Sequence, residues 1–167
     1  KTTTSGMIAH GLQHCQLDAS YILGGLFSDN STSPVHFCKS DWLVAEVDES
    51  DGTIDQFAPE VTLVLNLDWD HADQYGDAAK LDAAFLRLIK HTKQKLLLPD
   101  SFHLKPTGGA TIQTFDGAAK RLGLDPSPGG IFNKVNGDAA AAVLSFFDQP
   151  LKSDTLSTFP GMARRQA

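Results

Sequence analysis

Two runs of apolar residues place the strongest limit on the fold of this chain. Residues 41–48 read DWLVAEVD and residues 61–68 read VTLVLNLD, and both runs end in an acidic side chain. Near-continuous apolar runs of this length, rich in Val and Leu, are typical of strands buried on both faces of a parallel sheet. The sequence therefore predicts an α/β fold.

Local patterns predict the elements around these two strands. Helical spacing of apolar residues predicts three helices, at residues 2–15, 77–92 and 137–147. Asp138 would then stand in the first turn of the last helix, where a carboxylate is favourable. Strand-like runs stand at residues 95–99 and 110–115. This order of elements is typical of a mostly parallel sheet flanked by helices.

Length and composition limit the class of protein. The 167 residues fit one domain, and we expect residues 1–167 to form it. The formal net charge of −6 argues against a nucleic-acid partner, which would need clustered Lys and Arg. No apolar run approaches the roughly 18 residues of a membrane span. Two cysteines are too few for a disulfide framework, so we expect a reducing compartment and a cytoplasmic protein.

The first five residues, KTTTS, match the end of a phosphate-binding loop. In such a loop glycines let backbone N–H groups surround the phosphates, the Lys reaches the outer phosphates, and the next hydroxyl binds Mg²⁺. Lys1 and Thr2 would take these last two roles, and the glycines would precede residue 1. The alternative is a Thr-rich helix start, whose hydroxyls cap free N–H groups.

Glu46 stands between Ala45 and Val47, near the end of the first predicted strand. A buried carboxylate is unfavourable unless it is hydrogen-bonded, paired or bound to a cation. We therefore expect a cation or a strong donor beside Glu46. The acidic residues that follow, such as Asp51, fit a solvated loop.

His71 follows the second predicted strand, in the acidic stretch NLDWDHADQYGD at residues 66–77. In open α/β sheets ligands bind beyond the carboxyl ends of strands, where Glu46 and His71 would both lie. A carboxylate, an imidazole and a Thr hydroxyl form a plausible shell for a hard cation, completed by water and phosphate. The alternative is a surface histidine in a loop.

Three side chains in the last third of the chain are candidates for nucleotide binding. Asn133 and Asn136 are three residues apart and would share one face of a helix. Their amides could donate to and accept from an adenine edge, although Asn is also common in turns and caps. Arg165 carries a guanidinium that suits phosphate, although a basic terminus is often only a solvated end.

Taken together, these stretches resemble the central ATP-binding domain of the Mur ligases, the amide-forming enzymes of peptidoglycan synthesis. KTTTS resembles the end of the family's G-x-x-G-K-T/S-T loop, and AEVDESDG resembles the E-A-D-E-S-D segment of its alanine-adding branch. NLDWDHADQYGD, FNKVNGDAAAA and FPGMARRQ resemble N-x-x-x-D-H-x-D-x-Y, H-N-x-x-N-A-x-A-A and F-x-G-x-x-R-R. The motifs come in the family's order and span nearly the whole sequence.

The resemblance implies a P-loop NTPase-like fold and a role for each candidate residue. Lys1, Thr2 and Thr3 would bind ATP, with Lys1 on its phosphates. Thr2 and Glu46 would hold Mg²⁺, and His71 would hold a second Mg²⁺ near the acyl phosphate. At the other end of the nucleotide, Asn133 and Asn136 would contact the adenine, and Arg165 would contact the outer phosphates.

The implied reaction joins a carboxylate to an amine at the expense of ATP. The carboxylate takes the γ-phosphoryl group, and the amine of an amino acid displaces it as an amide. In the alanine-adding branch the substrates are UDP-N-acetylmuramate, L-alanine and ATP. One alternative is the murein-peptide recycling ligase, which shares the sequence DHAD, although DESDG favours the alanine-adding branch. Another is a non-catalytic nucleotide-binding scaffold.

Two departures from the family pattern change what we expect of this chain. Phe132 stands where the family usually has His, so the adenine contact is expected to differ. The domains that bind the UDP sugar and complete the ATP site in the family are absent from this sequence. We therefore expect no ligase activity from residues 1–167 alone.

Overall fold

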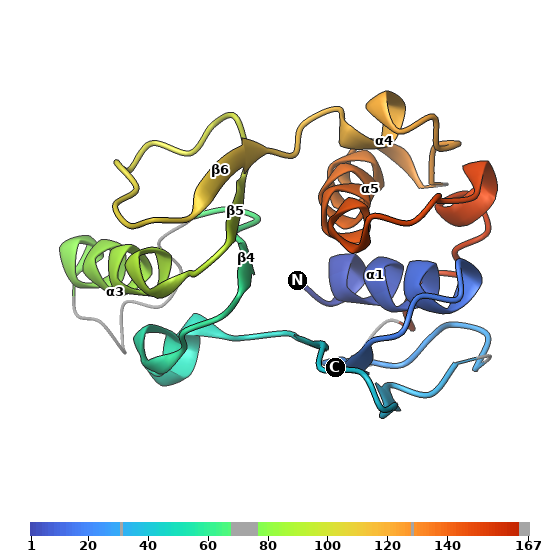
Figure 1. Ribbon diagram of the computed structural model, residues 1–167, viewed down its shortest axis with the longest axis horizontal. Helices are drawn as coiled ribbons and strands as arrows, with labels where there is room; N and C mark the ends of the chain where they lie inside the picture. Colours follow the sequence, from blue (N-terminus) through green and yellow to red (C-terminus); the bar gives the residue numbers. More distant parts are fainter. Residues whose placement is uncertain (31, 68–76, 128, 164–167) are drawn as a thin grey trace. The chain divides into compact units, whose positions relative to one another are not determined.

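The computed structural model describes residues 1–30, 32–67, 77–127 and 129–163. The chain divides into two compact units (Figure 1). The first unit contains Lys1–Glu46 and Asp116–Ala167, and the second contains Val47–Phe115. That residues 1–167 form a single domain stays a prediction.

Two long helices pack together in the first unit. α1 (Thr2–His14) and α5 (Gly130–Leu144) lie side by side (Figure 1). Four consecutive alanines of α5, residues 139–142, are buried. On α1, a methyl group at Gly11 would overlap the Leu144 side chain. Small residues on both helices therefore allow a close packing that larger side chains would prevent.

The first unit also contains a three-stranded sheet. β1 (Ser20–Ile22) lies between β2 (Val35–His36), which is antiparallel to it, and β3 (Leu43–Ala45), which is parallel. Tyr21 of β1 is fully buried, and Gln13 of α1 donates to its hydroxyl. The prediction that the strand at residues 41–48 is buried on both faces is wrong, because Leu43 is 53% exposed. Among the described strands, β3 is an edge of its sheet, and an edge strand has one side uncovered.

The described residues of the second unit contain a parallel sheet and a long helix. β5 (Lys95–Leu98) lies between β4 (Val61–Leu63) and β6 (Thr111–Thr114), and all three strands are parallel. Helix α3 (Ala78–His91) begins after Asp77, whose carboxylate accepts from the backbone N–H of Lys80 at 2.8 Å. Four buried apolar residues form a core between helix and sheet: Val64, Ile89, Leu96 and Leu98.

The described residues of the two units also contain short helices. They are α4 (Ala118–Arg121), η1 (Glu49–Asp51), η2 (Ile54–Gln56), η3 (Ser145–Phe147) and η4 (Ser153–Thr155). Gly123 follows α4 with a φ of 70°, a left-handed conformation that glycine adopts readily at the end of a helix.

The predicted α/β class, with parallel strands and helices, is confirmed. The predicted helices at residues 2–15 and 77–92 and the strands at residues 95–99 and 110–115 are present. The start of the last helix was predicted seven residues too late, because α5 begins at Gly130. Asp138 therefore lies in the middle of α5 and not in its first turn. Within the described residues, no helix has the length and apolar character needed to cross a membrane.

Two histidines of α1 attach this helix to the segment around η4. His14 Nε2 lies 2.9 Å from Asp154 Oδ1, and His10 Nε2 lies 3.0 Å from Thr158 Oγ1. The Thr158 hydroxyl donates to the backbone oxygen of Asp154 at 2.8 Å. Its oxygen is then the acceptor for His10, which fixes the neutral imidazole as the Nε2–H tautomer.

Protonation of His10 is expected to destabilise the fold. Burial, helped by the neighbouring His14, lowers the pKa of His10 below its ordinary value of 6.5, although Asp29 and Asp154 oppose the shift. The unfolded chain then binds the proton more readily than the folded protein does. The stability contributed by neutral His10 is complete above about pH 6.5 and is lost as the pH falls toward the lower pKa that His10 has in the folded protein.

Urea unfolding between about pH 7.5 and pH 5.5 tests this expectation. The free energy of unfolding should fall more steeply with acidification in the unaltered protein than in a His10→Gln variant, which keeps an N–H donor for Thr158. Equal slopes for the two proteins would contradict the assignment to His10.

Candidate functional site

The end of β3 and the start of α1 meet in the first unit. Glu46 directly follows the last residue of β3, and Thr2 is the first residue of α1. Thr2 Oγ1 donates a hydrogen bond of 3.1 Å to Glu46 Oε1. Two side chains that are far apart in the sequence, and that were predicted to share a site, are therefore in direct contact.

The second oxygen of Glu46 also has donors. Ser5 Oγ lies 3.0 Å from Glu46 Oε2, and the backbone N–H of Gly24 lies 3.4 Å from the same atom. The start of α1 adds the positive end of the helix dipole, which favours a carboxylate there. Among the described residues, no Lys or Arg side chain forms an ion pair with Glu46. Neutral donors of the described residues thus hold this carboxylate in place.

The chemistry of Thr2 and Glu46 fits a magnesium ion. A hydroxyl and a carboxylate are hard oxygen ligands, and Mg²⁺ commonly takes one or two such protein groups together with water and phosphate. Neighbouring oxygen ligands on Mg²⁺ lie about 3.0 Å apart, because bonds of about 2.1 Å meet at right angles. The 3.1 Å between Thr2 Oγ1 and Glu46 Oε1 is close to that separation. In the described part of the chain no three His, Cys, Asp or Glu side chains gather as metal ligands, so water and phosphate would supply the other ligands.

The packing of α1 on α5 orients Asn136. Thr4 Oγ1 donates to Asn136 Oδ1 at 2.9 Å. The amide oxygen is therefore engaged, and the amide NH₂ is the group that Asn136 can offer to a ligand. Asn133 lies one turn earlier on α5, and a methyl group on Gly129 would overlap its amide nitrogen. Asn133 and Asn136 are neighbours on one helix surface, as predicted.

The remaining predicted site residues are only partly described. Lys1 is exposed immediately before α1, and Thr3 is half-buried in its first turn. His71 and Arg165 lie outside the described residues. Thr2 and Glu46 are in contact, and the roles predicted for all the site residues, including the second cation ligand and the phosphate contact of Arg165, stay predictions.

Sequence reasoning missed three contributors to this site. Ser5 has no predicted role of its own within KTTTS, because its hydrogen bond to Glu46 forms only in the folded protein. Gly24 and Gly25 follow β1 in the stretch YILGG. Paired glycines after a strand do signal a close approach of backbone to another group, so this signal was present in the sequence.

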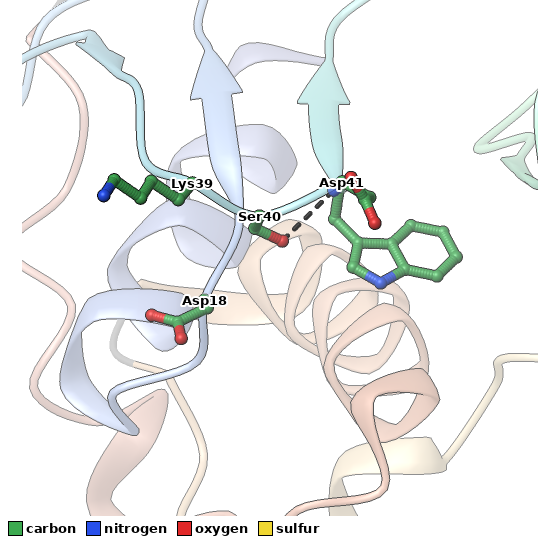
Figure 2. Close-up of a pocket in the computed structure, with 5 residues that line it drawn as sticks. Asp18, Lys39, Ser40 and Asp41 are labelled. Carbon is green, nitrogen blue, oxygen red and sulfur yellow. Dashed lines mark hydrogen bonds between the residues drawn. The ribbon is translucent and has the colours of Figure 1, made fainter.

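An open pocket of about 440 Å³ lies elsewhere in the first unit (Figure 2). It is lined by Asp18, Lys39, Ser40, Asp41 and Trp42, and Ser40 Oγ accepts from the Trp42 backbone N–H at 3.1 Å. These residues precede β1 and β3, whereas Glu46 follows β3. The pocket is therefore at the opposite ends of the two strands from the Thr2–Glu46 pair, and ligands of such sheets bind at the carboxyl ends.

Solved structures share this fold. UDP-N-acetylmuramate–alanine ligase from Thermotoga maritima matches 99% of this chain and 44% of its own, with a TM-score of 0.75 and 21% identity. The ligase from Neisseria meningitides that acts on UDP-N-acetylmuramate and L-alanyl-gamma-D-glutamyl-meso-diaminopimelate matches 98% of this chain and 64% of its own, with a TM-score of 0.79 and 17% identity. The chain therefore has the α/β fold of these ligases.

Sequence relatives define the family. UDP-N-acetylmuramate–L-alanine ligases of Mycobacterium bovis and Mycobacterium tuberculosis are 34% identical over 155 residues, which is 89% of this chain and 28% of theirs. The enzyme of Mycobacterium avium is 42% identical over 85 residues, or 51% of this chain and 17% of its own. No family model matches. The chain belongs to the Mur ligase family, and it spans about 28% of the length of the first two of these relatives.

Proposed function

We propose that this chain is the ATP- and magnesium-binding domain of a cytoplasmic ligase that joins L-alanine to UDP-N-acetylmuramate in peptidoglycan precursor synthesis. The observation that carries the proposal is the contact between Thr2 and Glu46 at the start of α1. The 34% identity to UDP-N-acetylmuramate–L-alanine ligases supports the choice of substrates. Residues 1–167 would form the central domain, and the UDP sugar would bind outside it.

The proposed reaction has two steps with balanced products. The carboxylate of UDP-N-acetylmuramate attacks the γ-phosphorus of ATP, which gives an acyl phosphate and ADP. The amine of L-alanine then displaces phosphate from the acyl carbon and forms the amide. Positioning and charge neutralisation are the main tasks of a protein in such a transfer.

The residues at the start of α1 would orient the phosphates. Backbone N–H groups at a helix N-terminus bind phosphate, and Lys1 and Thr3 would add an ammonium and a hydroxyl. Thr2 and Glu46 would hold a magnesium ion, which supplies charge neutralisation when bound. The neutral donors of Ser5 and Gly24 keep the Glu46 carboxylate turned toward Thr2.

Residues beyond α1 would complete the site. Asn136 would donate its NH₂ to an acceptor of the adenine, since its oxygen already accepts from Thr4. Asn133 would make the second adenine contact. Arg165 would bind the outer phosphates, and His71 would hold a second magnesium ion near the acyl phosphate.

A substrate test on the complete protein separates this proposal from its alternative. The likeness to the Neisseria meningitides enzyme favours a recycling ligase as the second candidate. We expect ADP release with ATP, UDP-N-acetylmuramate and L-alanine. Turnover with the tripeptide L-alanyl-γ-D-glutamyl-meso-diaminopimelate alone would reject L-alanine as the substrate. ATP binding without turnover of either would instead indicate a nucleotide-binding scaffold.

A further inference from the structure

We propose that Gly24 and Gly25 position Glu46 and Thr2. Each glycine leaves space for one of these two side chains, and a side chain at the glycine itself would fill that space. This inference rests on the proposed function, because it concerns the same magnesium and phosphate site. It adds two residues that would not touch the nucleotide or the cation. Both follow β1, whereas Thr2 begins α1 and Glu46 follows β3.

Gly24 lies directly against the carboxylate of Glu46. A methyl group on Gly24 would stand 3.0 Å from Glu46 Oε2 and 3.2 Å from Glu46 Cδ. Carbon atoms in ordinary contact are about 3.5–4.0 Å apart, so the carboxylate would have to move by several tenths of an ångström. This movement would also lengthen the 3.4 Å contact between the backbone N–H of Gly24 and Glu46 Oε2.

Gly25 lies against the methyl group of Thr2. A methyl group on Gly25 would stand 2.8 Å from Thr2 Cγ2. Relief of this overlap needs a movement of about 1 Å, since methyl groups pack at about 3.5–4.0 Å. Thr2 Cγ2 and Oγ1 are bonded to the same carbon, so the hydroxyl would move with the methyl group. The 3.1 Å hydrogen bond from Thr2 to Glu46 would then be lost or lengthened.

Backbone conformation does not explain these two glycines. Neither Gly24 nor Gly25 is among the glycines with positive φ in the described residues, so an L-residue could adopt either conformation without strain. The close approach of each glycine Cα to a side chain of the proposed site explains these two glycines instead. The two glycines thus set the positions of both proposed magnesium ligands.

Magnesium titrations of the complete protein test the role of Gly25. We expect Gly25→Ala to weaken Mg²⁺-dependent ATP binding about 10- to 100-fold, which is the range for loss of a group that orients a metal ligand. Calorimetry with ATP at increasing Mg²⁺ measures the effect. Gly109→Ala is the matched control, because no heavy atom lies within 4 Å of a methyl group there and its φ is not positive. Thermal unfolding of each variant without ligand checks that it is folded.

Removal of the methyl group of Thr2 gives the sharper test. A Thr2→Ser substitution keeps the hydroxyl and deletes Cγ2, the atom that the methyl group of Gly25→Ala would overlap. In that background Gly25→Ala should weaken Mg²⁺-dependent binding less than about threefold, if the overlap is the cause. Equal losses in the two backgrounds would overturn the proposal.

The remaining outcomes separate this inference from the proposed function. If Gly25→Ala does not fold, the exposed Gly24→Ala variant takes its place, with an expected loss of about three- to tenfold through displacement of Glu46. Binding by that variant equal to that of the unaltered protein would overturn the positioning role while the proposed function stands. Absence of Mg²⁺-dependent ATP binding by the unaltered protein would overturn both.

Discussion

Substitution of Glu46 by Gln should weaken Mg²⁺-dependent ATP binding by the complete protein roughly 100-fold or more. Gln has the size of Glu, and its amide oxygen can still accept from the Thr2 hydroxyl. It lacks the negative charge with which the Glu46 carboxylate attracts Mg²⁺, and its NH₂ group would replace the oxygen that accepts from Ser5 and Gly24. Calorimetric titration with ATP in the presence and absence of Mg²⁺ measures the change.

The control for this variant is Asp41→Asn. Asp41 is an exposed carboxylate in the same unit, at the other end of β3 from Glu46 (Figure 2). Removal of this charge should leave Mg²⁺-dependent binding within about twofold, because exposed charges this far from a site are screened. A Glu46→Gln protein that binds MgATP like the unaltered protein would show that Glu46 is not a cation ligand. It would favour a scaffold that only holds nucleotide.

Substitution of Asp138 by Ala should lower the free energy of unfolding by about 2–3 kcal/mol. Asp138 is only 4% exposed and accepts from the Ala119 backbone N–H at 3.0 Å and from Lys134 Nζ at 2.9 Å. The hydrogen bond with Asp138 also raises the pKa of Lys134. Removal of the carboxylate leaves the N–H at the start of α4 without its acceptor. The gain in helix propensity from Asp to Ala, about 0.5 kcal/mol, offsets only part of the loss.

Urea unfolding of three variants separates the contributions at Asp138. Asp138→Asn keeps an acceptor for Ala119 and loses only the pair with the largely exposed Lys134, so we expect a smaller loss than for Asp138→Ala. Asp125→Ala, at an exposed position, should change stability by no more than about 0.5 kcal/mol. An Asp138→Ala protein as stable as Asp125→Ala would show that the link between α4 and α5 contributes nothing measurable.

The elements that could be predicted from sequence are those with a strong local pattern. Helix α3 has a clear apolar stripe and an Asp at its N-cap, and β5 is a short run of leucines. The meeting of Thr2 with Glu46 rests on the resemblance to the Mur ligases, which implies that both residues hold Mg²⁺. The residues alone predict a cation or a strong donor beside Glu46 and a position for it beyond the carboxyl end of a strand.

The features that could not be predicted depend on tertiary contacts. The first half of α5 exposes Ile131, Phe132 and Val135 and so lacks the apolar stripe that marks a buried helix face. The sequence pattern therefore predicts a start of the helix that is too late, and with it a first-turn position for Asp138. Its real partner, the Ala119 N–H, belongs to another helix. The donors that Ser5 and Gly24 give to Glu46 likewise exist only when α1, β1 and β3 are packed together.

The position of a bound divalent cation shows whether Thr2 and Glu46 are its ligands. We would crystallise the complete protein with Mn²⁺, which gives an anomalous signal, and a non-hydrolysable ATP analogue. We expect an anomalous peak about 2–2.5 Å from both Thr2 Oγ1 and a carboxylate oxygen of Glu46, beside the phosphates. A cation bound away from both residues, with the Thr2–Glu46 hydrogen bond intact, would contradict this expectation.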